Sequence, residues 1–443
     1  MTPSTPKSRG TVLPILAAVG GLVGLGPAQA ARAAVPGITG PSFSLVASAD
    51  YTSQPDGAAI YSWGYGCNGA PAGFAPFGGT CPAMQLPGPT LIVYENQPVT
   101  VTLTNDLPVA AGNTSILFPG FHVTTAGGVA GRFTQEAANA SCNPAANPGC
   151  NTVTYTFSAP TPGTYAYYSG TQADLQIEMG LFGAIVVVPT ALQAGCAALS
   201  SADYRLAPSA YDNPATCYDR EYMFQLSEMD SRIHDAALAQ VKACAAALAQ
   251  NGGATCPGIA VVTEPYRPNY FLVNGRSMPD DMDTSYSRAY VHQPYNANPH
   301  MHPGERVLMR IVGQGRWQHP FHFHGNHARV LARDGNVLLS ASDGLSLAGP
   351  LLFTTPTVSG QAQDQIFTWT GKGLNWDVYN HRSGDGSVCL PDANGYYTAA
   401  SGAPVGAPNY GEWCADHLKP IPVTPPDPTI VAIGQWYGGT PYL

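Results

Sequence analysis

The chain has 443 residues and a formal net charge of −9, and only 11% of its residues are charged. Its 49 glycines and 41 prolines are typical of short strands joined by many turns, which argues against coiled coils and helical bundles. An acidic chain offers no basic stripe for phosphates, so we expect no nucleic-acid partner. With 44% hydrophobic residues the chain can bury a core, and the composition as a whole predicts an all-β protein.

Residues 1–34 have the pattern of a secretory signal peptide. Lys7 and Arg9 provide a basic start, Thr11 to Leu25 is apolar, and Ala28-Gln29-Ala30 fits the small-x-small cleavage pattern. A membrane anchor is the alternative, but the apolar stretch is shorter than the about 20 residues that span a bilayer. We therefore expect cleavage, no stable membrane anchor afterwards, and a mature protein that is secreted or periplasmic.

Residues 35–190 are predicted to form the first β-sandwich domain. The segment 87–104 predicts two strands on either side of a turn at Asn96-Gln97-Pro98. Apolar runs and alternation predict further strands at 153–157, 163–168 and 181–188.

The segment 191–260 differs from the rest in composition. It is rich in alanine, contains four cysteines, and has a helical period over 232–249. We expect a short, disulfide-rich connector with one helix.

Residues 261–443 are predicted to form the second domain. Strand signals return at 270–273, 305–312, 328–332 and 364–370. The stretch 383–425 is loop-like and rich in glycine, proline and asparagine. Two blocks of short strands of this length predict two β-sandwiches with Greek-key connections.

The chain has ten cysteines, and none of them lies in a CxxC pair. An even number of cysteines in an exported chain indicates disulfides rather than a zinc ribbon or a redox pair. Sequential pairing would close short, turn-rich loops, and it predicts the bonds Cys67–Cys81, Cys142–Cys150, Cys196–Cys217, Cys244–Cys256 and Cys389–Cys414.

Histidines concentrate in the motif His319-Pro-Phe-His322-Phe-His324-Gly-Asn-His327. On a strand, side chains at i and i+2 share a face, so His322 and His324 can point at one centre. A second pair at this spacing is His300-Met-His302. Imidazoles bind copper, zinc, iron and nickel. A hydrogen-bonded histidine network is the alternative, but four histidines in nine residues favour a metal site.

The first seven residues of this motif resemble the HPxHxHG signature of multicopper oxidases. Four segments also resemble the first plastocyanin-like domain of that family: Pro87-Gly-Pro-Thr-Leu, Asn105-Asp-Leu-Pro108, Gly163-Thr-Tyr-Ala-Tyr and Gly180-Leu-Phe-Gly-Ala-Ile-Val-Val-Val. The resemblance implies an all-β chain of two cupredoxin-like Greek-key domains. In the family the three motif histidines serve, in order, a type 1, a type 2 and a type 3 copper.

Most of the other ligands of that family are absent by the same resemblance. The histidine positions of the first domain hold Leu117, Pro119, Tyr168 and Gly170. The sequence Tyr379-Asn380-His381 stands where the family has His-Cys-His. A blue copper centre needs a cysteine thiolate, so the resemblance argues against laccase-type four-electron oxidation and against a copper nitrite reductase.

What remains predicts one copper per chain in the second domain, with zinc as the alternative ion. The predicted ligands are His322, His324 and His381, with His319 or His302 completing the set. The first functional hypothesis is an exported, multicopper-oxidase-like oxidoreductase with a reduced, non-blue copper site and an unknown substrate. The second is a non-catalytic metal-binding or structural extracellular protein of the same fold.

Overall fold

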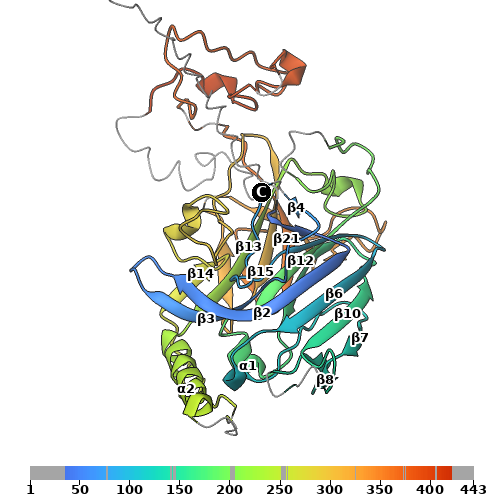
Figure 1. Cartoon of the computed structure of the whole chain (residues 1–443). Coiled ribbons are helices and arrows are strands. Elements are labelled where there is room, and N and C mark those ends of the chain that lie inside the picture. Colours follow the sequence, from blue (N-terminus) through green and yellow to red (C-terminus); the bar gives the residue numbers. More distant parts are fainter. Residues whose placement is uncertain are drawn as a thin grey trace, which may run out of the picture. The chain divides into compact units, whose positions relative to one another are not determined.

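The computed structural model describes residues 35–421, apart from 76–77, 140–141, 143–145, 200–204, 251–255, 257, 325, 373, 375 and 405–406. The expected signal peptide at 1–34 therefore lies outside the described residues. Within the described part, no helix has both the length and the apolar character needed to cross a membrane. Figure 1 shows a chain built mainly of strands, which confirms the all-β prediction.

The first block contains two five-stranded sheets. One sheet has the order β11 (Gly163–Tyr168), β12 (Phe182–Val188), β5 (Leu91–Tyr94), β1 (Gly37–Thr39), β4 (Phe74–Ala75). The other has the order β3 (Ala59–Cys67), β2 (Ser42–Ser53), β6 (Pro98–Asn105), β10 (Thr152–Ser158), β7 (Thr124–Gly127). The short strands β8 (Val129–Ala130) and β9 (Gln135–Glu136) pair separately. Strand β6 alternates buried and half-buried residues, as expected for a strand with one face on the core between sheets.

The second block is organised around one seven-stranded sheet. Six of its strands follow the order β14 (Tyr270–Val273), β13 (Arg220–Met229), β15 (Arg306–Gly313), β21 (Ala362–Thr368), β17 (Ala328–Arg333), β18 (Asn336–Val337). The seventh, β19 (Leu351–Leu352), also pairs with β17. A separate two-stranded sheet consists of β16 (His319–His322) and β20 (Thr354–Thr357).

Helical elements are few. The α-helices are α1 (Ala173–Gln176) and α2 (Ser231–Gln250). The 3₁₀ turns are η1 (Val109–Ala111), η2 (Pro214–Thr216), η3 (Asp280–Met282), η4 (Ala399–Ser401) and η5 (Cys414–Asp416). The helix predicted over 232–249 is thus confirmed as α2, which packs Ile233 and Ala237 into the core of the first block.

Strand β13 was not predicted from the sequence. It lies inside the segment expected to be a connector, yet it pairs in parallel with β15 and antiparallel with β14. The sequence gives no strand signal here because Glu221, Gln225 and Glu228 are buried along with the apolar residues of β13. A strand buried on both faces shows no polar-apolar alternation.

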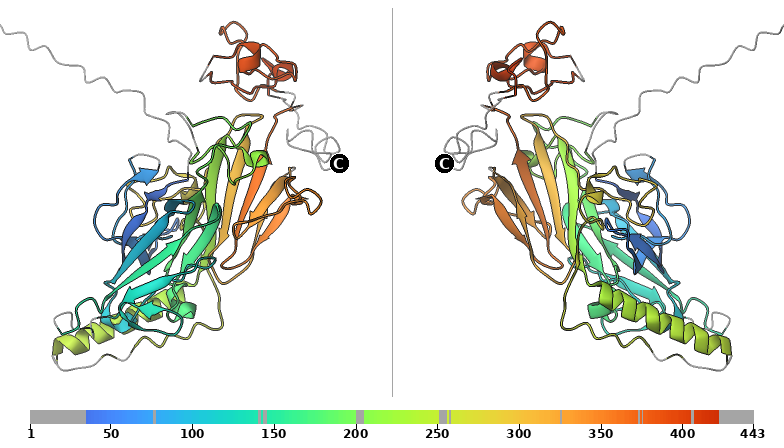
Figure 2. Two further views of the ribbon diagram at one scale, coloured as in Figure 1. Left: turned by 90° about the vertical axis from the view of Figure 1, so that its right-hand side faces the viewer. Right: turned by 90° about the vertical axis from the view of Figure 1, so that its left-hand side faces the viewer.

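The sheets of the two blocks pack against each other as layers (Figure 2). Val186 of the first block and Val312 of the second lie in one apolar cluster. A buried polar group joins the same sheets: Arg310 Nε lies 2.9 Å from Glu221 Oε2, and Arg310 Nη1 lies 3.0 Å from Thr164 Oγ1. These charges are buried but paired, which is the condition for their being tolerated.

The five predicted disulfides are all present, and no cysteine is left free. Each closes a loop of 8 to 25 residues. The thiolate that a blue copper centre requires is therefore not available from any cysteine of the chain.

Candidate metal centres

Two phenylalanines fix the orientation of the histidine motif on β16. Phe321 packs on Phe224, and Phe323 stacks on Phe367 in the apolar core beneath the motif. Because side chains along an extended segment alternate between faces, the intervening His322 and His324 are turned outward. Both are exposed.

The structure brings His322 and His324 together, as the i and i+2 spacing suggests. Their ring centroids lie 5.1 Å apart with an interplanar angle of 61°. Two imidazoles on one tetrahedral ion, with metal–nitrogen bonds of about 2 Å, have ring centres about 5 Å apart. The pair therefore has the separation required of two ligands to one ion.

Strand β20 fixes one of these rings. His322 is paired with Thr354 across the two-stranded sheet, and its Nδ1 lies 2.6 Å from Thr354 Oγ1. A hydroxyl at Nδ1 orients the ring and leaves Nε2 as the nitrogen that can bind an ion.

His319 and His302 face carboxylates. His319 Nε2 lies 2.6 Å from Oε2 of the buried Glu228, at the end of β13. His302 Nδ1 lies 3.1 Å from Glu305 Oε1 and 3.2 Å from Arg220 Nη2. Neither belongs to a group of three or more potential ligands among the described residues.

His381, the remaining predicted ligand, lies in a different group. In the described part of the chain, a single group of three or more His, Cys, Asp or Glu side chains could hold an ion, and it consists of Asp377, His381, Glu412 and His417. One ligand atom from each lies within 4.8 Å of the others. The predicted combination of His381 with His322 and His324 is thus divided between two places.

In this C-terminal group each imidazole faces both carboxylates. His381 Nδ1 lies 2.8 Å from Asp377 Oδ2 and 3.6 Å from Glu412 Oε1. His417 Nδ1 lies 2.7 Å from Glu412 Oε1 and 3.5 Å from Asp377 Oδ2. The two rings have centroids 4.8 Å apart. Four ligand atoms therefore surround one point.

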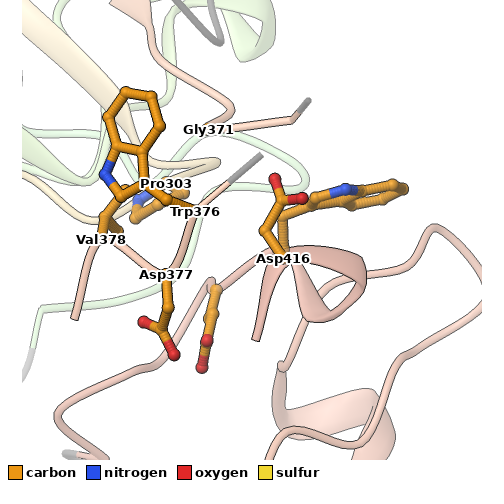
Figure 3. A pocket seen from close by; sticks show the side chains of 8 residues that line it. Pro303, Gly371, Trp376, Asp377, Val378 and Asp416 are labelled. Atoms are coloured by element: carbon orange, nitrogen blue, oxygen red, sulfur yellow. The ribbon is translucent and has the colours of Figure 1, made fainter. Parts of the chain in front are cut away.

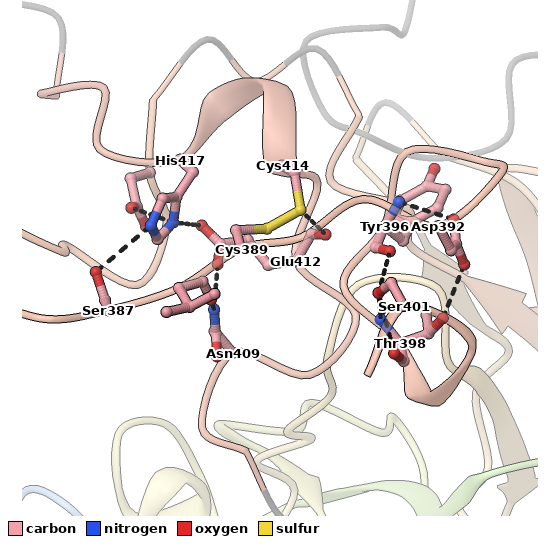
Figure 4. Close-up of a disulfide and its surroundings, with 12 residues drawn as sticks. Ser387, Cys389, Asp392, Tyr396, Thr398, Ser401, Asn409, Glu412, Cys414 and His417 are labelled. Atoms are coloured by element: carbon pink, nitrogen blue, oxygen red, sulfur yellow. Dashed lines mark hydrogen bonds and ion pairs between the residues drawn. A yellow bond between two sulfur atoms is a disulfide. The ribbon is translucent and has the colours of Figure 1, made fainter. Parts of the chain in front are cut away.

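Further hydrogen bonds hold the two carboxylates in place. Asp377 accepts the backbone N–H of Tyr379 on Oδ1 and that of Leu418 on Oδ2. Glu412 Oε2 accepts from Asn409 Nδ2 at 2.6 Å, as Figure 4 shows. Burial raises the pKa of Asp377, but the hydrogen bonds from Leu418 and His381 outweigh it and bring the pKa below its ordinary value.

The chain forms this group by two local turns and one crosslink. Asp377 and His381 are joined by a turn in which the Asn380 N–H donates to the Asp377 carbonyl, with Asn380 at φ 57°. Asn is one of the few non-glycine residues that adopt this conformation readily. Glu412 and His417 flank η5, which the disulfide Cys389–Cys414 fastens (Figure 4).

A small pocket adjoins the C-terminal group. Figure 3 shows it, and its lining includes the carboxylates Asp377 and Glu412 together with Pro303, Gly371, Trp376, Val378, Trp413 and Asp416. Both carboxylates line this pocket, and each of the two residues is only 3% exposed.

In the first block, apolar packing occupies positions where the multicopper oxidase family has copper-binding histidines. Leu117 and Tyr168 exchange backbone hydrogen bonds in an isolated bridge. A Cβ at Gly170 would lie 2.8 Å from Leu117 Cγ, so the leucine occupies the space beside this glycine. Leu117 and Gly170 have no side-chain atom that could bind copper.

Comparisons with known proteins agree with the fold and the motif. Two multicopper oxidase family models match the chain, one at residues 81–191 and the other at 263–348, which includes the β16 motif. The fold and these two matches define a cupredoxin-type protein. These two matches support assignment of the chain to the multicopper oxidase superfamily, and the family that they name implies a copper cofactor.

Several solved structures resemble the chain at low identity. A multicopper oxidase, mgLAC, is 19% identical with a TM-score of 0.45 and covers 73% of this chain and 74% of its own. A blue copper oxidase from Nitrosomonas europaea is 19% identical, with a TM-score of 0.44 and coverage of 75% and 76%. A copper nitrite reductase from the same organism is 18% identical, with a TM-score of 0.43 and coverage of 74% and 84%. No curated protein matches the chain.

Sequence reasoning missed three of the four C-terminal residues: Asp377, Glu412 and His417. A signal for them exists. Asp377 and His381 stand at i and i+4, before Cys389 in the sequence. Glu412 and His417 stand at i and i+5, on either side of Cys414, and Cys389 and Cys414 form a disulfide. Because the disulfide joins Cys389 to Cys414, it returns the chain that follows the first pair to the position of the second pair.

Proposed function

We propose that the mature chain is an exported, copper-binding oxidoreductase that holds one copper at an open, non-blue site on His322 and His324. Its substrate is not identified. The observation that carries the proposal is the separation of 5.1 Å between the two rings, on the segment that matches the multicopper oxidase family. Copper is the ion of choice because divalent copper binds nitrogen ligands more tightly than its neighbours in the first transition row.

The residues around this pair have definable roles. The two imidazoles would hold the ion, and Thr354 Oγ1 would keep the His322 ring in one orientation. Phe321 and Phe323 hold the intervening backbone against the core. A bound copper ion supplies one-electron redox chemistry, and the exposure of both rings leaves its other positions accessible to water or a small reductant.

The non-catalytic alternative also has a specific observation in its favour. All cysteines are in disulfides, and Leu117 packs beside Gly170 where the family has copper ligands. A chain without those centres would bind metal and carry out no multi-electron reduction of oxygen.

Metal content and turnover, measured together, test the proposal. The mature protein is produced by export from cells grown with added copper. Its copper content per chain is then compared with that of the double variant His322→Ala/His324→Ala. The control is His300→Ala, which removes an exposed histidine outside the motif. We expect the double variant to lose one copper per chain and the control to lose none.

Electron paramagnetic resonance and oxidation of phenols and metal ions complete the test. We expect a copper signal without blue-copper character and a copper-dependent oxidation that the double variant lacks. Copper content unaffected by the double substitution would refute the site. Copper binding at the pair without any turnover would establish the non-catalytic alternative.

A further inference from the structure

We propose a second metal centre in the C-terminal segment, in which Asp377, His381, Glu412 and His417 bind one zinc ion as a closed, structural site. This centre is independent of the copper proposal, because it shares no residue with the pair on β16. Its function would be to hold residues 377–381, which precede the loop closed by the disulfide Cys389–Cys414, against residues 412–417 at the end of that loop.

The nitrogen–oxygen distances in the group are close to those of a tetrahedral site, and all four ligand atoms lie within 4.8 Å of one another. Ligands at about 2 Å from a tetrahedral ion lie about 3.3 Å from one another. The four nitrogen–oxygen distances in the group are 2.7, 2.8, 3.5 and 3.6 Å, which lie on both sides of that value. Changes of about 0.2 to 0.6 Å would bring these four distances to that value.

The chemistry of the donors selects the class of ion. Calcium and magnesium are bound by oxygen ligands, so two imidazole nitrogens disfavour both. Divalent copper prefers a square-planar arrangement, whereas zinc accepts four tetrahedral ligands and binds both imidazole and carboxylate. Two carboxylates also neutralise the charge of a divalent ion, which favours its burial.

The surroundings are those of a supported site. The two carboxylates are almost fully buried, and the His381 and His417 side chains are 15% and 12% exposed. The carboxylate oxygens accept hydrogen bonds from Tyr379, Leu418 and Asn409, and His417 Nε2 lies 3.4 Å from Ser387 Oγ. Partners of this kind orient the ligands of metal sites.

The position of the group explains what the ion would do. Apart from its disulfide, the segment around it has a small apolar cluster of Tyr397, Ala403 and Ala407. An ion that binds only the folded segment adds its binding free energy to that segment's stability. Zinc would therefore crosslink 377–381 to 412–417 beside the covalent bond.

Zinc binding to the metal-free mature protein tests the centre. The protein is stripped with a chelator and titrated with zinc by calorimetry, and then with cobalt as a spectroscopic substitute. We expect one zinc per chain and the visible absorption of tetrahedral cobalt. The variant Asp377→Asn/Glu412→Gln should weaken zinc binding by more than about 100-fold, and Asn409→Ala, which removes a supporting hydrogen bond, by about 10-fold.

Two control variants are needed. The first tests whether loss of any carboxylate charge weakens zinc binding, and the second tests whether the zinc centre depends on the copper pair. Asp385→Asn, an exposed carboxylate of the same segment, should bind zinc normally. His322→Ala/His324→Ala should lose copper and keep this zinc, so that failure of one proposal is distinguishable from failure of the other. A near-ultraviolet spectrum like that of the parent shows that the altered segment is folded.

Two results would overturn the centre. One is the absence of zinc binding by the metal-free parent protein at micromolar zinc. The other is binding of unchanged affinity in the Asp377→Asn/Glu412→Gln variant.

Discussion

The two histidine pairs of the second block differ in what surrounds them. His322 stands exposed at the end of β16 in a two-stranded sheet, and His324 stands exposed two residues further on. The hydroxyl of Thr354 is the polar group bonded to His322. His381 and His417 face two buried carboxylates inside a disulfide-bonded segment. The comparison teaches that a strand can present ligands to an open site, whereas a closed site requires turns that return the chain to the same point.

The largest expected effect comes from removing the disulfide Cys389–Cys414, which should affect the C-terminal histidine pair and leave the exposed pair unchanged. In Cys389→Ser/Cys414→Ser, loss of a bond spanning 25 residues should destabilise the C-terminal segment by about 3 kcal/mol. Zinc affinity should fall with it, and copper binding at His322 and His324 should not change. Limited proteolysis of the segment and metal analysis measure the two effects, and a parallel loss of copper would contradict the separation.

A smaller effect is expected at the exposed pair. Thr354→Val removes the oxygen that lies 2.6 Å from His322 Nδ1 while keeping the shape of the side chain. We expect copper affinity to fall about 10-fold, as for loss of other supporting hydrogen bonds. Competition with a copper chelator measures it, and zinc affinity serves as the internal control. Unchanged copper affinity would show that Thr354 does not orient the ring.

The smallest expected effect is the loss of stability of the C-terminal segment at low pH. Because the folded-state pKa of Asp377 lies below its ordinary value, its ionised form stabilises the segment above the unfolded pKa of about 3.9. That contribution should be lost as pH falls through the lower, folded-state pKa. Hydrogen exchange of the 377–419 segment in metal-free protein would follow the loss. Asp377→Asn should remove this part of the acid dependence, and a variant that keeps it would show that another group is responsible.

The sequence predicted the fold well where one physical rule dominates. Strand β11 lies at the predicted 163–168, and all five disulfides follow sequential pairing. Strand β13 was missed because Glu221, Gln225 and Glu228 are buried in it as partners of other polar groups. Such residues are distinguishable from surface residues only once their tertiary partners are known.

The two candidate metal centres also differ in how far the sequence predicts them. The spacing of His322 and His324 is local, and a strand converts it directly into a shared face. Asp377 and Glu412 are 35 positions apart in the sequence, so their meeting depends on the path of the intervening loop. The resemblance to multicopper oxidases pointed to His381, through the comparison of Tyr379-Asn380-His381 with His-Cys-His, and it did not point to Asp377, Glu412 or His417.

The interleaving of β13 and α2 limits how the gene could have been assembled. Strand β13 belongs to the second sheet, and the helix that follows it directly, α2, fills the core of the first block. The chain therefore enters the second block, returns to the first, and enters the second again. No single break in the polypeptide yields two complete halves, so a single crossover between related genes would combine contacting parts of one core from two different parents.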